Sequence, residues 1–181
     1  MAENIQITVT NARLSYANIF RAKAMEGSVG EPKYSCVFLL DKKNNAKDIK
    51  TIQDAIAKQV KEGLKGKHPG ADKVCLKDGT NKTDVDGYGD GVMYVSASNI
   101  KRPVIVDQKR NPLAEEDGKP YSGCIVNGVF NLWVQDNKYG KRINASLTHV
   151  QFVKDGPVFG EAVKPAEAVF KDISEDSDDA V

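Results

Sequence analysis

Apolar and polar positions alternate along much of the chain, which is typical of β-strands with one buried face. Between residues 4 and 16, Ile5, Ile7 and Val9 fall on one side of such a strand, and a slip of phase near Asn11 predicts a bulge. Further strands are predicted over residues 33–41, 92–100, 103–107, 121–135 and 142–153. The short turn at 136–140 joins the last two strands into an antiparallel hairpin.

A different period predicts one helix. Apolar residues recur every three or four positions from Ile49 to Leu64, which places them on one face of a helix that begins after Asn45 and stops at Gly66. The opposite side is rich in lysine and is either a basic contact surface or the solvated face that any amphipathic helix presents. We favour the solvated face for these residues, which are Lys47, Lys50, Lys58 and Lys61.

About six strands and one helix, without alternation of the two, favour a mainly β fold, namely a small antiparallel barrel with one inserted amphipathic helix. The connecting segments 17–32, 66–91 and 108–120 are rich in Gly, Pro or charged residues and are predicted as loops. The length of 181 residues fits one domain over residues 1–160 and a flexible acidic tail over residues 161–181. Because no apolar run approaches the roughly 20 residues of a membrane span and no secretory signal opens the chain, we expect no membrane partner and an intracellular location.

Residue types that carry enzyme or metal chemistry are sparse. Three cysteines and two histidines, all far apart, indicate neither a disulfide framework nor a zinc site. Four aspartates in a Gly-rich stretch are the strongest candidate for a divalent ion, but their spacing departs from a calcium loop, and no nucleotide-binding loop or nucleophile with a base accompanies them. They are Asp78, Asp84, Asp86 and Asp90. We therefore expect no catalytic residue, no metal and no cofactor.

Charge is distributed unevenly along the chain. The formal net charge is +1, but five acids and no base lie within residues 172–181, so residues 1–171 hold 26 bases and 20 acids and carry +6. A mobile polyanion can compete with phosphates for a cationic surface and, once displaced, bind another protein. The alternative is a tail that only maintains solubility. The tail acids are Asp172, Glu175, Asp176, Asp178 and Asp179.

Two aromatic residues share a strand face with small polar residues. Trp133 lies on the same side of its strand as Asn131, and Tyr94 lies on the same side as Ser96 and Ser98. An exposed ring on a sheet can stack on an unpaired base, which is worth about 1 to 3 kcal/mol and depends little on sequence. The alternative for each ring is packing beneath a loop or helix.

Cations near these strands complete a predicted DNA-binding surface, in which rings stack on bases and Lys and Arg side chains follow the phosphates along a groove. Tyr34 and Tyr139 are further candidates for stacking beside Trp133 and Tyr94, and Tyr16 stays undecided. The predicted phosphate-binding residues are Arg13, Arg21, Lys23, Lys33, Lys101, Arg102, Lys138, Lys141 and Arg142.

Short motifs add a resemblance to a known family. They are Lys33-Tyr34-Ser35, Asp86-Gly87-Tyr88, Arg102-Pro103 followed by Asp107, Tyr121-Ser122-Gly123-Cys124, and Val150-Gln151-Phe152 with Gly156. Over most of residues 4–160 this pattern resembles the phage-encoded single-stranded DNA-binding proteins of the OB-fold type. The resemblance implies an OB-like barrel that coats single-stranded DNA during phage replication or recombination in the cytoplasm of the bacterial host. It also implies a tail that contacts replication or recombination proteins.

A function from another class stays open at this point. A structural or adaptor protein of a phage assembly would use exposed strand aromatics to join subunits and would have no nucleic-acid role. The sequence leaves the oligomeric state open as well. Binding to oligo-dT, weakened by salt, separates the two functions.

Overall fold

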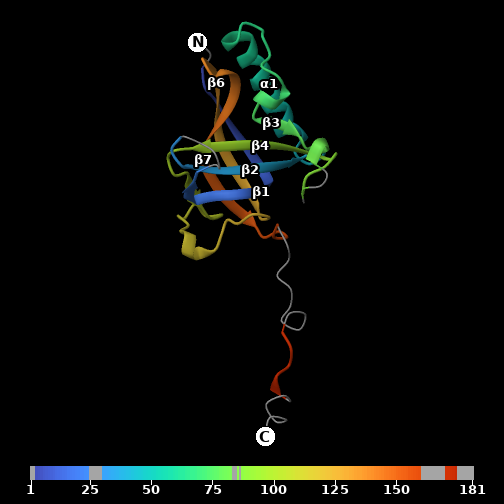
Figure 1. Ribbon diagram of the computed structural model, residues 1–181, viewed down its shortest axis with the longest axis vertical. Helices are drawn as coiled ribbons and strands as arrows, with labels where there is room; N and C mark the ends of the chain where they lie inside the picture. The colour runs from blue at the N-terminus through green and yellow to red at the C-terminus, as the bar shows by residue number, and fades with distance from the viewer. Residues whose placement is uncertain (1–2, 25–29, 83–84, 86, 160–169, 175–181) are drawn as a thin grey trace.

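The computed structural model describes residues 3–24, 30–82, 85, 87–159 and 170–174, and its strands form one sheet (Figure 1). Seven strands within these ranges follow the order β3-β4-β2-β1-β6-β7-β5, and a parallel pairing of Ser98 with Ser146 joins β4 to β7. That pairing closes β1, β2, β4, β7 and β6 into a five-stranded barrel. The strands are β1 (Ile5–Lys23), β2 (Lys33–Asp41), β3 (Leu76–Asp78), β4 (Val92–Asn99), β5 (Val104–Val106), β6 (Ile125–Asn137) and β7 (Gly140–Lys154).

Alternation along the strands fills the barrel with apolar side chains. Along β6, Val126, Phe130 and Leu132 are fully buried, whereas Asn127, Val129 and Asn131 are half-buried. Phe130 stacks on Phe38 of β2, with ring centroids 5.9 Å apart. Gly128 permits this packing, because a Cβ there would lie 2.4 Å from the Phe38 ring.

Strand β1 is irregular and longer than its sequence pattern predicts. The bulge near Asn11 is confirmed, because the register with β6 shifts between Val9 and Ala12 and Asn11 has a φ of 53°. The predicted end of the strand at Tyr16 is wrong. The chain stays paired with β2 as far as Lys23, opposite Lys33, because hydrogen bonds to a distant strand override a loop-like local composition.

One helix, α1 (Ala46–Gly63), lies between β2 and β4 in the chain, and its predicted apolar face is buried against β1 and β6. Gln59 donates hydrogen bonds from Nε2 to the backbone oxygens of Glu3 and Leu132, which ties the helix to the barrel. Asn45 precedes the helix, as predicted, but its side chain donates to Thr10 O and accepts from Asp41 N instead of capping it. The four lysines named above are exposed.

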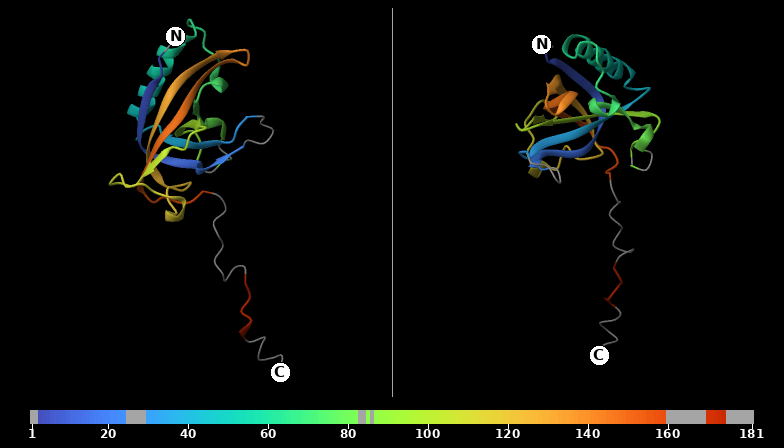
Figure 2. Two further views of the ribbon diagram at one scale, coloured as in Figure 1. Left: turned by 90° about the vertical axis from the view of Figure 1, so that its left-hand side faces the viewer. Right: turned by 45° about the horizontal axis from the view of Figure 1, so that its top comes forward.

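The remaining strands differ from their predicted bounds by a few residues at most, except for β3, which lies in a segment predicted as a loop. The expected mainly β barrel with one inserted helix is confirmed. The β6–β7 hairpin extends beyond the rest of the barrel beside α1, as Figures 1 and 2 show. No helix in the described ranges is long and apolar enough to cross a membrane.

Candidate nucleic-acid interface

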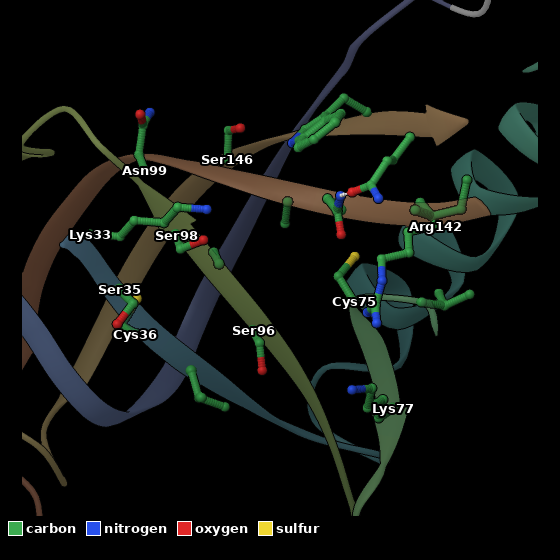
Figure 3. A pocket seen from close by; sticks show the side chains of 18 of the residues that line it. Lys33, Ser35, Cys36, Cys75, Lys77, Ser96, Ser98, Asn99, Arg142 and Ser146 are labelled. Carbon is green, nitrogen blue, oxygen red and sulfur yellow. Dashed lines mark hydrogen bonds between the residues drawn. The ribbon is translucent and has the colours of Figure 1, made fainter. Parts of the chain in front are cut away.

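A groove of about 660 Å³ crosses the outer face of β2 and β4. Its floor is formed by short side chains that pair in register, Ser35 with Ser98 and Val37 with Ser96. The β6–β7 hairpin contributes one wall, and the segment from residue 72 to residue 77 contributes another. Figure 3 shows Lys33 and Ser35 on one side, Ser96 in the middle, and Arg142 and Lys77 on the other side. The groove therefore has a floor of small side chains and cations at its edges.

Two aromatic residues border this groove. Trp133 of β6 lines it and is half-buried, so part of the indole is accessible, as its polar neighbours predict. Tyr16 of β1 also lines it and is 57% exposed, at a point where a φ of 46° interrupts the strand. Ile100, 56% exposed, adds an apolar contact surface. The groove thus offers flat and apolar surfaces from three separate elements.

Four cations line the groove, against one acid, Asp72, among the described residues. Lys33 and Arg142 were predicted from the sequence, whereas Lys73 and Lys77 were not. The missed pair flanks the apolar island of residues 74–76, and that island was the available signal, because its last residue, Leu76, begins β3. Pairing of β3 with β4 brings Lys77 to the groove, and Lys73 lies next to Val74, which bridges to Ile143 of β7.

The groove also contains a thiol, Cys75, which is 8% exposed. Burial raises the pKa of Cys75 to about 12, so the thiol is neutral at physiological pH and adds no negative charge. Cys36 lines the groove too, and burial raises its thiol pKa even further. The electrostatic potential of the groove is therefore determined by its three lysines, its arginine and Asp72.

The expected exposure of Tyr94 is wrong, because this residue is 7% exposed. Its side chain does point outward from β4, but the ring of Tyr88 packs edge-on against it with centroids 5.1 Å apart. Lys82 Nζ lies 5.3 Å from the centroid of the Tyr94 ring. The excursion after β3 thus covers the end of the β2–β4 face, which a strand pattern does not reveal.

The other two candidate rings do not line the groove. Tyr34 is half-buried at the start of β2, opposite Asn99 of β4. Tyr139 is 77% exposed at the tip of the β6–β7 hairpin, with Lys138 Nζ 5.1 Å from its ring centroid. Among the predicted stacking residues, the structure brings Trp133 alone to the groove.

Most of the predicted cations also lie elsewhere. Arg21 forms an exposed ion pair with Glu115 at 2.9 Å, and Arg102 lies over Phe20 with its guanidinium carbon 5.6 Å from the ring centroid. Lys141 lies 3.4 Å from the Asp136 carboxylate on the hairpin. The predicted cations outside the groove lining are Arg13, Arg21, Lys23, Lys101, Arg102, Lys138 and Lys141.

Arg13 holds in place segment 155–159, which follows the last barrel strand, β7. Its Nη2 donates to Pro157 O at 2.6 Å, and its guanidinium carbon lies 3.8 Å from the centroid of the Phe159 ring. Phe159 in turn packs on Gly87, where a Cβ would come within 2.4 Å of the ring. Arg13 is therefore committed to segment 155–159.

The acidic candidates are only partly described. Asp78 accepts hydrogen bonds from the Thr80 hydroxyl and amide and from Lys42, which together lower its carboxyl pKa to about 2. Asp172 is exposed and accepts from Ser174 N. Within the described ranges, no three His, Cys, Asp or Glu side chains gather as metal ligands. The candidate acids that lie outside the described residues are Asp84, Asp86, Glu175, Asp176, Asp178 and Asp179.

A closed five-stranded barrel of this strand order is an OB fold. Comparison with known proteins agrees with this class. The family described as Enterobacter phage Enc34, ssDNA-binding protein matches residues 5–181, and the chain belongs to this family. It is a family of binding proteins and not of enzymes, as the sequence predicted.

Individual relatives cover nearly the whole chain. The putative protein p50 of Acyrthosiphon pisum secondary endosymbiont phage 1 is 36% identical over 94% of this chain and 95% of its own. The single-stranded DNA-binding protein from bacteriophage Enc34 in complex with ssDNA is 31% identical, covers 86% of this chain and 89% of its own, and superposes with a TM-score of 0.77. The gp2.5 protein of bacteriophage T7, at 15% identity, 91% and 98% coverage and a TM-score of 0.52, shares the fold.

Proposed function

We propose that this protein binds single-stranded DNA without strong sequence preference, in the groove across β2 and β4. The observation that carries the proposal is the presence of two accessible rings, Trp133 and Tyr16, in one groove with four cations. The Enc34 relative that superposes on this barrel is described in complex with ssDNA, which supports the same ligand here.

The chemistry of the groove suits an unpaired strand. Bases that are not paired can lie flat on Trp133 and Tyr16, and each stacked base contributes about 1 to 3 kcal/mol whatever its identity. A duplex keeps its bases stacked on one another and cannot offer their faces to these rings. Lys33, Lys77 and Arg142 at the edges attract the phosphates, so binding weakens as salt rises.

The acidic tail gives this binding a switch. The chain leaves the barrel at Phe159, which packs on Gly87 in the excursion that covers Tyr94 at the end of the β2–β4 face. A polyanion attached there competes with phosphates for the groove. When DNA binds, it displaces the tail, and the free tail then contacts replication or recombination proteins of the phage in the host cytoplasm. Residues 1–160 then form the DNA-binding domain and residues 161–181 form the tail.

Fluorescence titration tests the proposal, because Trp133 is the only tryptophan in the chain. Oligo-dT should quench its emission, a duplex of equal length should do so far less, and added salt should restore the emission. A protein that ignores oligo-dT at low salt would instead fit the structural or adaptor function. Repeating the titration with single-stranded RNA determines whether the 2′-hydroxyl changes affinity.

A further inference from the structure

A second hollow lies directly beyond Trp133. It measures about 640 Å³ and shares both Trp133 and Ser146 with the groove, so the indole separates two adjoining spaces. The second hollow lies between the β6–β7 hairpin, which contributes Val134 and Asp136, and the end of α1, which contributes Glu62 and Gly63. Taken by shape alone, a bound strand could continue from the groove into this space.

The charges of the two spaces have opposite signs. The groove has four cations and one acid among its described residues, whereas the described lining of the second hollow has two acids, Glu62 and Asp136, and one cation, Lys65. Lys141 lies 3.4 Å from the Asp136 carboxylate and partly offsets its charge, although both side chains are 40% or more exposed. Counted over the described lining residues, the charge therefore falls from +3 in the groove to −1 in the second hollow, and Lys141 brings the surroundings of the second hollow close to neutral.

The end of α1 strengthens this effect. Gly63 is the last residue of the helix and lines the second hollow. The C-terminus of a helix carries roughly half a negative charge, which is unfavourable for anions within about one turn. A phosphodiester in this hollow would face that partial charge as well as two carboxylates.

We infer that the path of a bound strand ends at Trp133, because the second hollow offers the next phosphate no net positive charge and places Glu62, Asp136 and the C-terminus of α1 beside it. This inference rests on the proposed function and adds a boundary to it. It makes the groove a site of defined length, with Trp133 at its closed end and Glu62 and Asp136 as the residues that determine that length.

The test is a length series of oligo-dT, from about 4 to about 16 nucleotides, titrated against the full-length protein and against Glu62→Gln/Asp136→Asn. For the unaltered protein, affinity rises with length and then levels off. The volume of the second hollow is that of one drug-sized ligand, so the affinity of the variant should level off at an oligonucleotide about one nucleotide longer. Its affinity for the longest oligonucleotides should rise about two- to fourfold, with little change for the shortest.

A matched control removes two acids that line neither space, Asp54 of α1 and Glu116, both exposed. Asp54→Asn/Glu116→Gln changes the net charge equally, so it should shift affinity similarly at every length and leave the levelling-off point unchanged. An identical levelling-off point in all three proteins, or an equal shift in both variants, would overturn the inference. Failure of the unaltered protein to bind any oligo-dT would instead refute the proposed function.

Discussion

The four cations of the groove give the salt dependence of binding a predicted size. Each contact to a single-stranded phosphate contributes about −0.7 to the slope of log affinity against log salt, so four contacts give about −2.8. Affinity should then fall about 50-fold between roughly 50 and 200 mM salt. Lys77→Gln removes one of the four contacts and should change the slope to about −2.1.

Lys58 offers a matched control for this substitution, because it is an exposed lysine on α1 that does not line the groove. Lys58→Gln lowers the net charge by the same amount but should keep a slope close to −2.8. The assay is fluorescence anisotropy of a labelled oligo-dT at four or more salt concentrations, with thermal unfolding to confirm that all proteins are folded.

Two results of the salt series would refute the predicted slopes. Equal slopes for Lys77→Gln and Lys58→Gln would mean that charge acts over the whole surface and that the groove is not the phosphate path. A slope far steeper than about −3 in the unaltered protein would mean that cations outside the groove, such as Lys23 or Lys101, also meet phosphates.

Four further predictions concern single features. Trp133→Ala should weaken oligo-dT binding by about 1 to 3 kcal/mol without lowering the melting temperature much, and unchanged anisotropy titrations would show that the indole only packs. Tyr94→Ala should cost about 3 kcal/mol of unfolding free energy, measured in urea, because the ring is buried, while Tyr94→Phe should cost little. Deleting residues 172–181 should tighten binding at low salt but not at high salt, and equal affinities at low salt would exclude competition by the tail. The carboxyl of Asp78 has a folded pKa of about 2 and an unfolded value near 3.8, so its stabilising effect is complete above the unfolded value and is lost as pH falls through the folded value. Asp78→Asn should therefore lower the melting temperature much more at pH 6 than at pH 2.

Much of the fold is predictable from the sequence because the barrel strands and the helix have clear periods. Residues 33–41 contain the continuous apolar run Cys36 to Leu40 and form β2 with the predicted bounds, and the bulge near Asn11 follows from a local slip in the alternation of the first strand. Local composition fails where pairing with a distant strand decides the structure. The second half of β1 reads as a loop but pairs with β2, and β3 is only three residues long, so its pattern is too short to detect.

The site is less predictable than the fold, because a strand pattern shows which way a side chain points and not what covers it. Trp133 and Tyr94 both point outward among polar residues, yet only Trp133 lines the groove. Tyr94 differs because the excursion after β3 returns over it and places Tyr88 on its ring. No periodicity within residues 79–91 predicts that return, which also involves contacts of Tyr88 with Ser15 and of Gly87 with Phe159, far away in sequence.

The same limit applies to the cations, and Arg13 shows why. In the sequence it is one more positive charge beside a strand, indistinguishable from Lys33. In the structure its guanidinium binds Pro157 O and the Phe159 ring, so its charge is committed to segment 155–159 and is not offered to phosphates. The net charge of +6 over residues 1–171 therefore does not measure what the groove presents, because cations committed to the fold contribute to the long-range attraction of DNA and not to the contacts that hold it.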